Sequence, residues 1–379
     1  MEKNLGTNFL ITNASFSNIQ VTLFQISIIF IDVIFSSVKI YDFNNITRYF
    51  LQIYLTFINV TFNAETSSSS YNIVNISGSR CTHVTFLHSV ISETRLSFGC
   101  CNCSLVFKFV NFSQLICTNC PPTISMETKE LKNVYKKKII MLKSRNIFLF
   151  QNVLVTCSGK HSEHNSSFLF VTIPNVDINI TNSTFNSIFV PIKFIPSVSI
   201  KYFIGGLINI AIKCVTFMKC MGVKGGAFIV HIPDIQTYIL LVNLRLSHLY
   251  FVKNSADVGS ALHIVSVTHY DGHLLPYHFV NLTLQYCVFD NNVAQYHSAA
   301  IYAAGFMQFE IFYCSFNFDK TEMLDDDHGA IISAKVQSFT FKHSTIKAVN
   351  VGKILLFELD NKGLISDGAL AILCPNWTY

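Results

Sequence analysis

The chain has 379 residues, of which 50% are hydrophobic and 13% charged, so it can build a large continuous core and is not a disordered chain. Its formal net charge of +5 is spread over this whole length, which argues against a nucleic-acid-binding protein. Thirty-five phenylalanines, with many isoleucine, valine and threonine residues, favour β-strands, because aromatic and branched side chains pack well on a pleated surface.

The opening segment, MEKNLGTNFLITNASF, lacks the apolar core and the small-residue cleavage site of a secretory signal. Taken alone, it favours a cytosolic chain. The cysteines and the glycosylation motifs described below favour an oxidising, secretory compartment instead. We therefore expect an extracellular or cell-surface location, and we expect the chain to be part of a longer, membrane-anchored protein whose signal lies upstream.

Eleven Asn-x-Ser/Thr motifs are candidate glycosylation sites, and each would mark a surface position in a secreted protein. An alternative remains open, because the pattern Asn-apolar-Thr also occurs in these repeats wherever a turn is followed by a strand. The candidate asparagines are Asn13, Asn45, Asn59, Asn75, Asn102, Asn111, Asn165, Asn179, Asn182, Asn281 and Asn376.

The stretch 21–35 is the best candidate for a membrane span. It contains Gln25, Ser27 and Asp32, and it is shorter than the roughly 20 apolar residues that a spanning helix needs. Its start alternates apolar and polar residues, which is typical of a strand. A multi-span membrane protein is therefore an alternative that we do not favour, and we expect no membrane span.

A short phrase recurs along the whole chain: an apolar strand ends on a bulky residue, and small or polar residues follow. The bulky residues mostly lie about 19 to 38 positions apart, a spacing typical of solenoids, propellers and arrays. These anchors are Phe16, Phe35, Phe62, Phe86, Phe112, Val155, Phe185, Phe217, Phe251, Phe289, Phe316 and Ile346.

Each repeat holds several short apolar runs separated by turn residues and has no helical period. A chain that winds once per repeat would lay each strand beside its counterpart, at about 4.8 Å, and would stack like residues on like. The sequence thus predicts an all-β, single-stranded parallel β-helix of about twelve coils over residues 1–374. Its core ladder would contain Phe62, Phe86, Phe112, Phe185, Phe217, Phe251, Phe289 and Phe316.

Residues 117–146 interrupt this rhythm, because 43 positions separate Phe112 from Val155. The segment contains the only strongly basic run, METKELKNVYKKKIIMLKSR. We expect a loop or short helix that projects from the stack in place of one anchor. A phosphate, glycosaminoglycan or lipid headgroup partner is an alternative to a merely solvated excursion.

The repeats after Phe217 carry a second phrase: GGAFIV at 225–230, GSALHI at 259–264, SAAIYA at 298–303 and HGAIIS at 328–333. With FVKN at 251–254 and FDNN at 289–292, residues 217–334 resemble the repeats of chlamydial polymorphic outer-membrane proteins. More broadly they resemble the right-handed β-helices of the pectin-lyase-like superfamily, and the resemblance implies the winding hand. FMKC at 217–220 and FNFD at 316–319 depart from the pattern, since they lack the asparagine.

Small residues in these phrases would let the backbone pass close at a corner, and the asparagine of each FxxN phrase would adopt a left-handed conformation. The terminal CPNWTY includes a predicted exit segment, residues 375–379, that resembles the passage from such a rod into a further module. We therefore expect the chain to be truncated there.

The cysteines suggest disulfides. Cys287 and Cys314 both lie two residues before an anchor, so their Cα atoms would be about 4.8 Å apart, within disulfide range. Stacked free thiols fit that spacing equally well. The remaining candidates, which contain CxC and CxxC and leave zinc as a weaker alternative, are Cys100, Cys101, Cys103, Cys117 and Cys120.

Relatives in the pectin-lyase-like superfamily include carbohydrate lyases and hydrolases, which need acids gathered on one face. The only dense acidic cluster is 325–327, and neighbouring repeats supply no partner acids at matching positions. We assign no catalytic, metal-binding or cofactor-binding residue. The sequence predicts a non-enzymatic adhesion, recognition or spacer rod with a protein or glycan ligand, and the alternative is a polysaccharide lyase or glycoside hydrolase.

Overall fold

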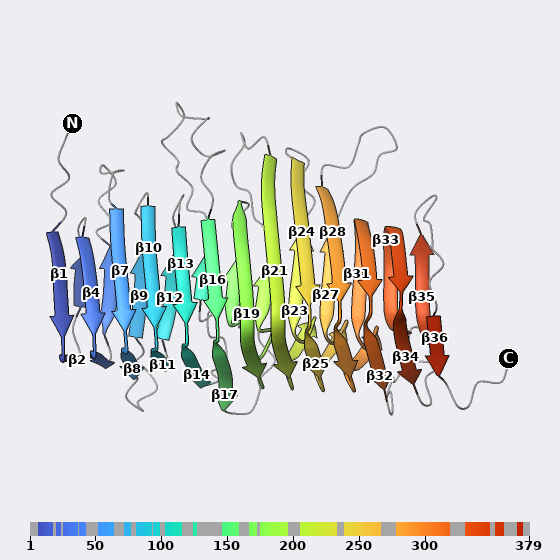
Figure 1. Ribbon diagram of the computed structural model, residues 1–379, viewed down its shortest axis with the longest axis horizontal. Helices are drawn as coiled ribbons and strands as arrows, with labels where there is room; N and C mark the ends of the chain where they lie inside the picture. Colours follow the sequence, from blue (N-terminus) through green and yellow to red (C-terminus); the bar gives the residue numbers. More distant parts are fainter. Residues whose placement is uncertain are drawn as a thin grey trace.

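The computed structural model describes the chain as strands stacked side by side along one long axis (Figure 1). No helix occurs in the described part of the chain. The described residues are 7–17, 20–23, 26–36, 38–42, 52–63, 72–76, 81–92, 94–98, 103–115, 124–126, 146–158, 167–172, 175–195, 205–232, 239–266, 278–318, 330–348, 353–359 and 370–373.

Thirty-three of the described strands form one parallel sheet. They fall into three series in which each strand pairs with the next member. The first series contains β1 (Thr7–Thr12), β4 (Ile26–Ile31), β7 (Gln52–Ile58), β10 (Cys81–Leu87), β13 (Cys103–Lys108), β16 (Asn146–Gln151), the starts of β19 (Val176–Asn186) and β21 (Gly205–Met218), β24 (Ile239–Ser247), β28 (His278–Gln285), and the ends of β31 (Ile301–Phe312) and β33 (Ala330–Lys342).

The second series follows the first after a sharp corner. It contains β2 (Ser15–Ser17), β5 (Ile34–Ser36), β8 (Thr61–Asn63), β11 (Val90–Ser92), β14 (Asn111–Leu115), β17 (Leu154–Ser158), the ends of β19 and β21, β25 (Tyr250–Val252), β29 (Val288–Asp290), β32 (Ser315–Phe318), β34 (Ser344–Ala348) and β36 (Leu370–Leu373).

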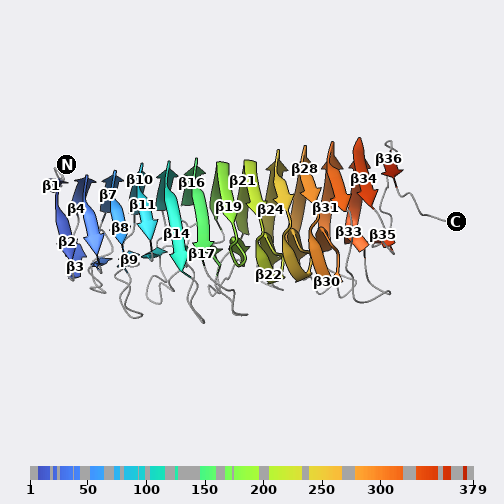
Figure 2. The same cartoon turned by 90° about the horizontal axis from the view of Figure 1, so that it is seen from below.

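The third series completes each repeat. It contains β3 (Gln20–Leu23), β6 (Lys39–Asp42), β9 (Asn72–Ile76), β12 (Thr94–Phe98), β15 (Ile124–Met126), β18 (Leu169–Val171), β20 (Ile192–Phe194), β23 (Phe228–Ile232), β27 (Leu262–Ser266), the starts of β31 and β33, and β35 (Lys353–Leu359). A smaller sheet of β22 (Met221–Lys224), β26 (Ser255–Val258) and β30 (Val293–His297) lies between the second and third series (Figure 2).

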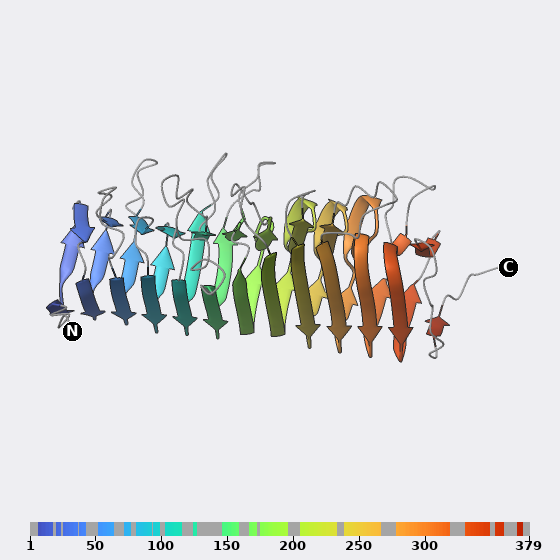
Figure 3. The same ribbon diagram turned by 90° about the horizontal axis from the view of Figure 1, so that it is seen from above.

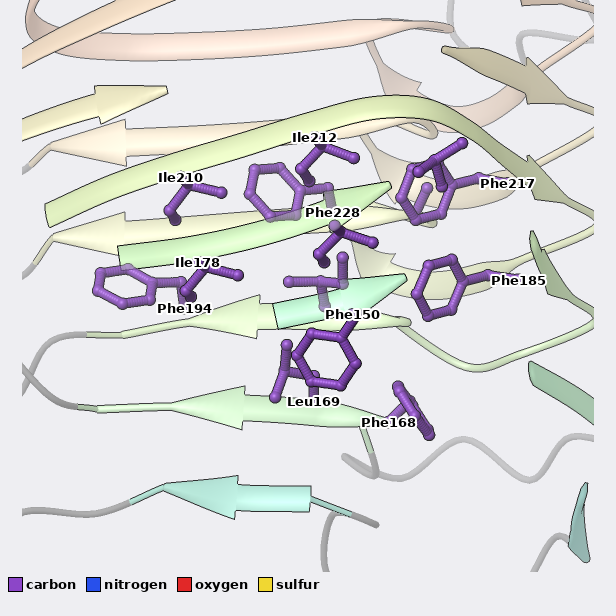
Figure 4. Close-up of a cluster of buried hydrophobic side chains, with 14 of the residues drawn as sticks. Phe150, Phe168, Leu169, Ile178, Phe185, Phe194, Ile210, Ile212, Phe217 and Phe228 are labelled. Atoms are coloured by element: carbon purple, nitrogen blue, oxygen red, sulfur yellow. The ribbon is translucent and has the colours of Figure 1, made fainter. Parts of the chain in front are cut away.

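Three strands from three series recur in the same order along the stack, and the three views agree on this arrangement (Figures 1 to 3). Alternate residues of the strands point inward, so the buried residues of all three series form one hydrophobic cluster. Figure 4 shows this for Ile178, Phe194 and Phe217, which belong to the first, third and second series. The arrangement is all-β and consistent with a parallel β-helix or solenoid.

The predicted anchors occupy equivalent positions of the second series, with one exception. Phe16 pairs with Phe35, Phe35 with Phe62, and the register continues through Phe112, Val155, Phe185, Phe217, Phe251, Phe289, Phe316, Ile346 and finally Ile372. Rings in adjacent strands stack, with 5.1 Å between the centroids of Phe185 and Phe217.

The exception is Phe86, for which the prediction was wrong. Ile91 is the residue that pairs with Phe62 and with Phe112. Phe86 belongs to the first series, where its ring stacks between Phe57 and Phe107 at centroid distances of 4.5 and 5.0 Å. Two phenylalanine ladders run in parallel in this part of the stack, and spacing along the chain alone assigned Phe86 to the wrong one.

The corner between the first and second series has a left-handed backbone in every described repeat, with φ between 49° and 55°. Most of the corner N–H groups donate to a carbonyl of the next repeat, for example from His248 to Gln285 at 2.9 Å. Asn, Asp and His tolerate this conformation best among residues with a side chain. The corner residues are Asn13, Asp32, Asn59, His88, Phe109, Asn152, Asn182, Cys214, His248, Tyr286, Tyr313 and His343.

The FxxN asparagines do not adopt the left-handed conformation that the sequence predicted. Lys253 and Asn291, one residue earlier, have the positive φ angles of 52° and 46°. Asn254 and Asn292 are instead almost completely buried, with 0 and 1% of their surface exposed. Their amides hydrogen-bond to each other, at 2.9 Å from Nδ2 of Asn254 to Oδ1 of Asn292. They also satisfy the backbone inside the bend, because Oδ1 of Asn254 accepts from the N–H of Cys220 at 2.9 Å and its Nδ2 donates to the carbonyl of Phe217 at 3.1 Å.

The small-residue phrases form the second corner. Gly225 and Gly259 have φ of 59°, and a Cβ on Gly225 would lie 2.6 Å from the carbonyl oxygen of Phe228. The backbone thus passes as close at this corner as the sequence predicted, and only glycine fits there without strain. The fourth phrase is offset by one residue from its predicted alignment, because Ile301 pairs with Ile332 and not with Ile331.

The predicted excursion at 117–146 is only partly described. Within it, β15 pairs with β12 and β18 as a member of the third series. Phe112 and Val155 are direct partners, so the 43-residue spacing does not omit a repeat. The lysine-rich run and the exit segment 375–379 lie outside the described residues. Within the described part of the chain, no helix has the length and hydrophobicity required to cross a membrane.

Candidate functional site

The outer side of the first series carries a hollow of about 280 Å³ over β24, β28 and β31. It exists because Val242, Leu244 and Leu246 of β24 point into the core, so the residues between them point outward. The same alternation continues in β28 and β31. The residues that line the hollow are Asn243, Leu244, Arg245, Asn281, Leu282, Thr283, Gln308 and Glu310.

A ladder of side-chain amides forms one row of this outer side. Asn281 donates to Asn243 at 2.9 Å, Asn243 to Asn209 at 2.9 Å, and Asn209 to the carboxylate of Asp177 at 2.8 Å. A carboxylate can only accept, so Asp177 fixes the orientation of Asn209 and, through it, of the two amides that follow. The ladder therefore presents Oδ1 of Asn281 as its accepting end, beside Gln308 on the next strand.

The neighbouring row carries opposite charges in register. Arg245 pairs with Thr283, and Thr283 pairs with Glu310. The hydroxyl of Thr283 donates to Oε2 of Glu310 at 3.4 Å, and Arg245 is exposed. Guanidinium donors and carboxylate acceptors thus flank a hydroxyl, an arrangement that suits a ligand rich in hydroxyl groups.

Four stacked aromatic rings border the strands that carry the hollow. His248, Tyr286, Tyr313 and His343 occupy consecutive corners, and their neighbouring ring centroids are 5.0, 5.1 and 5.0 Å apart. About half of each tyrosine is exposed. Each ring covers the face of the next, so the inner rings offer solvent their polar edges rather than a flat apolar platform.

A lyase or hydrolase would need partner acids on this outer side. In the described strands, Glu310 has Thr283 and Thr340 beside it, and Asp177 has Asn209 and Ile147. The acidic cluster 325–327 lies outside the described residues. Among the residues that the structure describes, no three His, Cys, Asp or Glu side chains come together in a way that could hold a metal ion.

The described sequons differ in how accessible they are. Five of the asparagines are exposed: Asn13, Asn59, Asn111, Asn179 and Asn182. Asn75 and Asn281 are half-buried, and the amide of Asn281 is engaged in the ladder. Asn45, Asn102, Asn165 and Asn376 lie outside the described residues.

Cys287 and Cys314 stack in adjacent repeats, as the sequence predicted, and the structure holds both as free thiols. The backbone N–H of Cys287 donates to Sγ of Cys314 at 3.4 Å. Burial raises the pKa of the Cys287 thiol well above its ordinary value. Of the two alternatives left open by the sequence, the structure has stacked thiols.

The structure does not test the remaining disulfide candidates. Cys103 begins β13, but its side chain lies outside the described part, as do Cys100, Cys101, Cys117 and Cys120 altogether.

The sequence analysis did not identify Arg245, Thr283 and Glu310 as a group, because they belong to three separate repeats. The period-two alternation of each strand, combined with an alignment of the repeats, could have shown that these three side chains point outward at neighbouring positions. Comparisons of this chain with protein-family models, with curated proteins and with solved structures found no match.

Proposed function

We propose that the chain is a single-stranded parallel β-helix of about twelve coils that acts at the cell surface or outside the cell as a non-enzymatic recognition, adhesion or spacer rod. The observation that carries this proposal is the unbroken register of the anchor positions from Phe16 to Ile372. Backbone groups paired along the whole length make a stiff scaffold, and outward side chains then repeat about every 4.8 Å.

The hollow on the first series is the recognition surface that we favour. Arg245 and Glu310 supply a charged donor and a charged acceptor, and the amide ladder adds an oriented row of neutral groups. Few apolar side chains line it, so a hydroxyl-rich glycan suits it better than an apolar peptide. The resemblance of residues 217–334 to surface-protein repeats points in the same direction.

Exposure of five sequon asparagines supports a secretory location. Expression of the chain behind a secretory signal should produce several glycosylated species that collapse to one band after glycosidase treatment. Occupancy should be higher at Asn179, which is exposed, than at Asn281, whose amide is hydrogen-bonded. A single band that glycosidase does not shift would contradict this location.

A glycan array tests the recognition surface. We expect the full chain to bind a restricted set of glycans. Arg245→Ala combined with Glu310→Gln should weaken that binding about tenfold or more, because both variants remove a charged group that would hydrogen-bond to the glycan. Lys347→Ala, which changes an exposed strand residue of the second series, is the matched control and should leave binding unchanged. Absence of glycan binding, or equal loss in both variants, would refute this role of the hollow.

A further inference from the structure

A cluster of basic side chains lies on the third series, away from the hollow. Lys193 of β20, Ile229 of β23 and His263 of β27 form one row, since Lys193 pairs with Ile229 and Ile229 with His263. His231 is two residues beyond Ile229, so it is diagonal to both basic residues of the row, at about 8 Å between Cα atoms. These residues point outward, because the residues that alternate with them are buried in the core.

Lys224 adds a fourth basic group from the small sheet, at the end of β22. Its charge acts on both His231 and His263. Lys224 is exposed, whereas Lys193 and His231 are half-buried. The cluster therefore has an open side at Lys224 and a covered side at His263.

His263 is the most enclosed member, with only 4% of its surface exposed. The corner at Gly225 closes over it, and a Cβ on Gly225 would lie 3.0 Å from the Cβ of His263. The ring stacks on Tyr302 at a centroid distance of 5.2 Å. Within the described residues, Nδ1 of His263 is buried without a hydrogen-bond partner. A buried polar atom in this state is destabilising unless a ligand or water satisfies it.

Burial and neighbouring positive charges oppose protonation of the two histidines. Burial and the charges of Lys224 and His231 lower the pKa of His263 to about 4. Burial, Lys224 and Lys193 also lower the pKa of His231, and burial lowers that of Lys193. No carboxylate is among the groups that act on them in the described part of the chain. The positive charges of Lys224 and Lys193 thus favour the arrival of a negative charge.

We propose that Lys193, Lys224, His231 and His263 form a binding site for a tetrahedral oxyanion, a sulfate or phosphate group. The cluster combines ammonium and imidazole donors from four strands, and a tetrahedral oxyanion offers them more acceptor oxygens than a carboxylate does. Lys193 is held in place by the ring of Phe170, whose centroid lies 5.9 Å from Nζ. The site does not depend on the proposed function of the hollow, because it uses other residues on another series.

Anion binding should couple to protonation of the two histidines. A bound oxyanion favours their charged forms, so it raises both pKa values and draws protons onto the site. Lys224, Lys193 and the other histidine are the charged groups that oppose this protonation. Affinity should therefore rise as the pH falls from 8 to 5.

Isothermal titration calorimetry of the full chain in low-salt chloride buffer at pH 6 tests the site. The probes are sodium sulfate, inorganic phosphate, heparin and desulfated heparin. Binding of sulfate or phosphate identifies a free oxyanion as sufficient, and binding of heparin alone identifies a sulfate ester on a glycan. Either result supports the site, provided that desulfated heparin binds much more weakly than heparin.

Lys193→Ala combined with Lys224→Ala should weaken binding about tenfold, and Lys347→Ala should change it less than twofold. His231→Gln should remove most of the pH dependence without exposing the buried His263. Circular dichroism and thermal melting verify that each variant is folded. The proposal is overturned if no probe binds, if affinity does not change with pH, or if Lys347→Ala weakens binding as much as the double variant.

Discussion

Replacing Phe251 with alanine is the sharpest test of the ladder. The side chain is fully buried, and its ring stacks on Phe217 and Phe289 at centroid distances of 5.2 and 4.8 Å. Removing a buried phenylalanine costs about 3 to 5 kcal/mol, and each lost aromatic contact contributes about 0.5 to 1.5 kcal/mol within that range. Because two contacts are lost, we expect the free energy of unfolding to fall by about 4 to 5 kcal/mol.

Urea unfolding followed by far-UV circular dichroism measures this difference. Tyr250→Ala is the matched control, since Tyr250 precedes Phe251 on the same strand but is 51% exposed, and it should cost less than about 1 kcal/mol. Phe251→Leu keeps most of the volume and should cost about 1.5 kcal/mol. A loss below about 1 kcal/mol for Phe251→Ala, or no more than for Tyr250→Ala, would refute the stacked ladder.

Asn254→Ala should lower the unfolding free energy by about 2 to 3 kcal/mol in the same assay, because the backbone N–H of Cys220 and the carbonyl of Phe217 both lose their hydrogen bonds to the Asn254 side chain. His263 has a pKa of about 4 when folded and near 6.5 when unfolded, so the unfolded chain binds the extra proton between these values. Stability in chloride buffer should be complete above pH 6.5 and fall by an amount on the order of 3 kcal/mol toward pH 4. His263→Asn should flatten this pH dependence, and an unchanged slope would contradict it. Alkylation pulses with peptide mapping should label exposed Cys214 rapidly and buried Cys314 only after unfolding, and equal rates would contradict the stacked thiols.

The alternation within strands and the anchor phrase were readable from the sequence, since both are local patterns. A residue such as Phe251 carries its own signal: strand-formers before it, polar residues after it and a copy of itself in the next repeat. The all-β class and most of the ladder followed from these patterns. The stacking of Cys287 with Cys314 followed for the same reason, as both hold one place relative to the anchor.

Other assignments required the register. Phe86 and Ile91 are five residues apart and both buried, and only the pairing with Phe57 and Phe62 tells which ladder each one joins. The conformation of Asn254 was also predicted wrongly. Local propensity favoured a left-handed asparagine, but the hydrogen bond to Asn292 in the next repeat favours burial of the amide.

The sequence by itself determined a stack of parallel strands, because inward alternation and like-on-like repetition are properties of each repeat. Only the tertiary structure decided which outward residues become neighbours. Lys193 and His263 are 70 positions apart, and one intervening strand separates them in the sheet. Their proximity depends on the lengths of the connections between strands, because these lengths set which residues of successive repeats pair. A local sequence pattern within one repeat does not reveal this pairing.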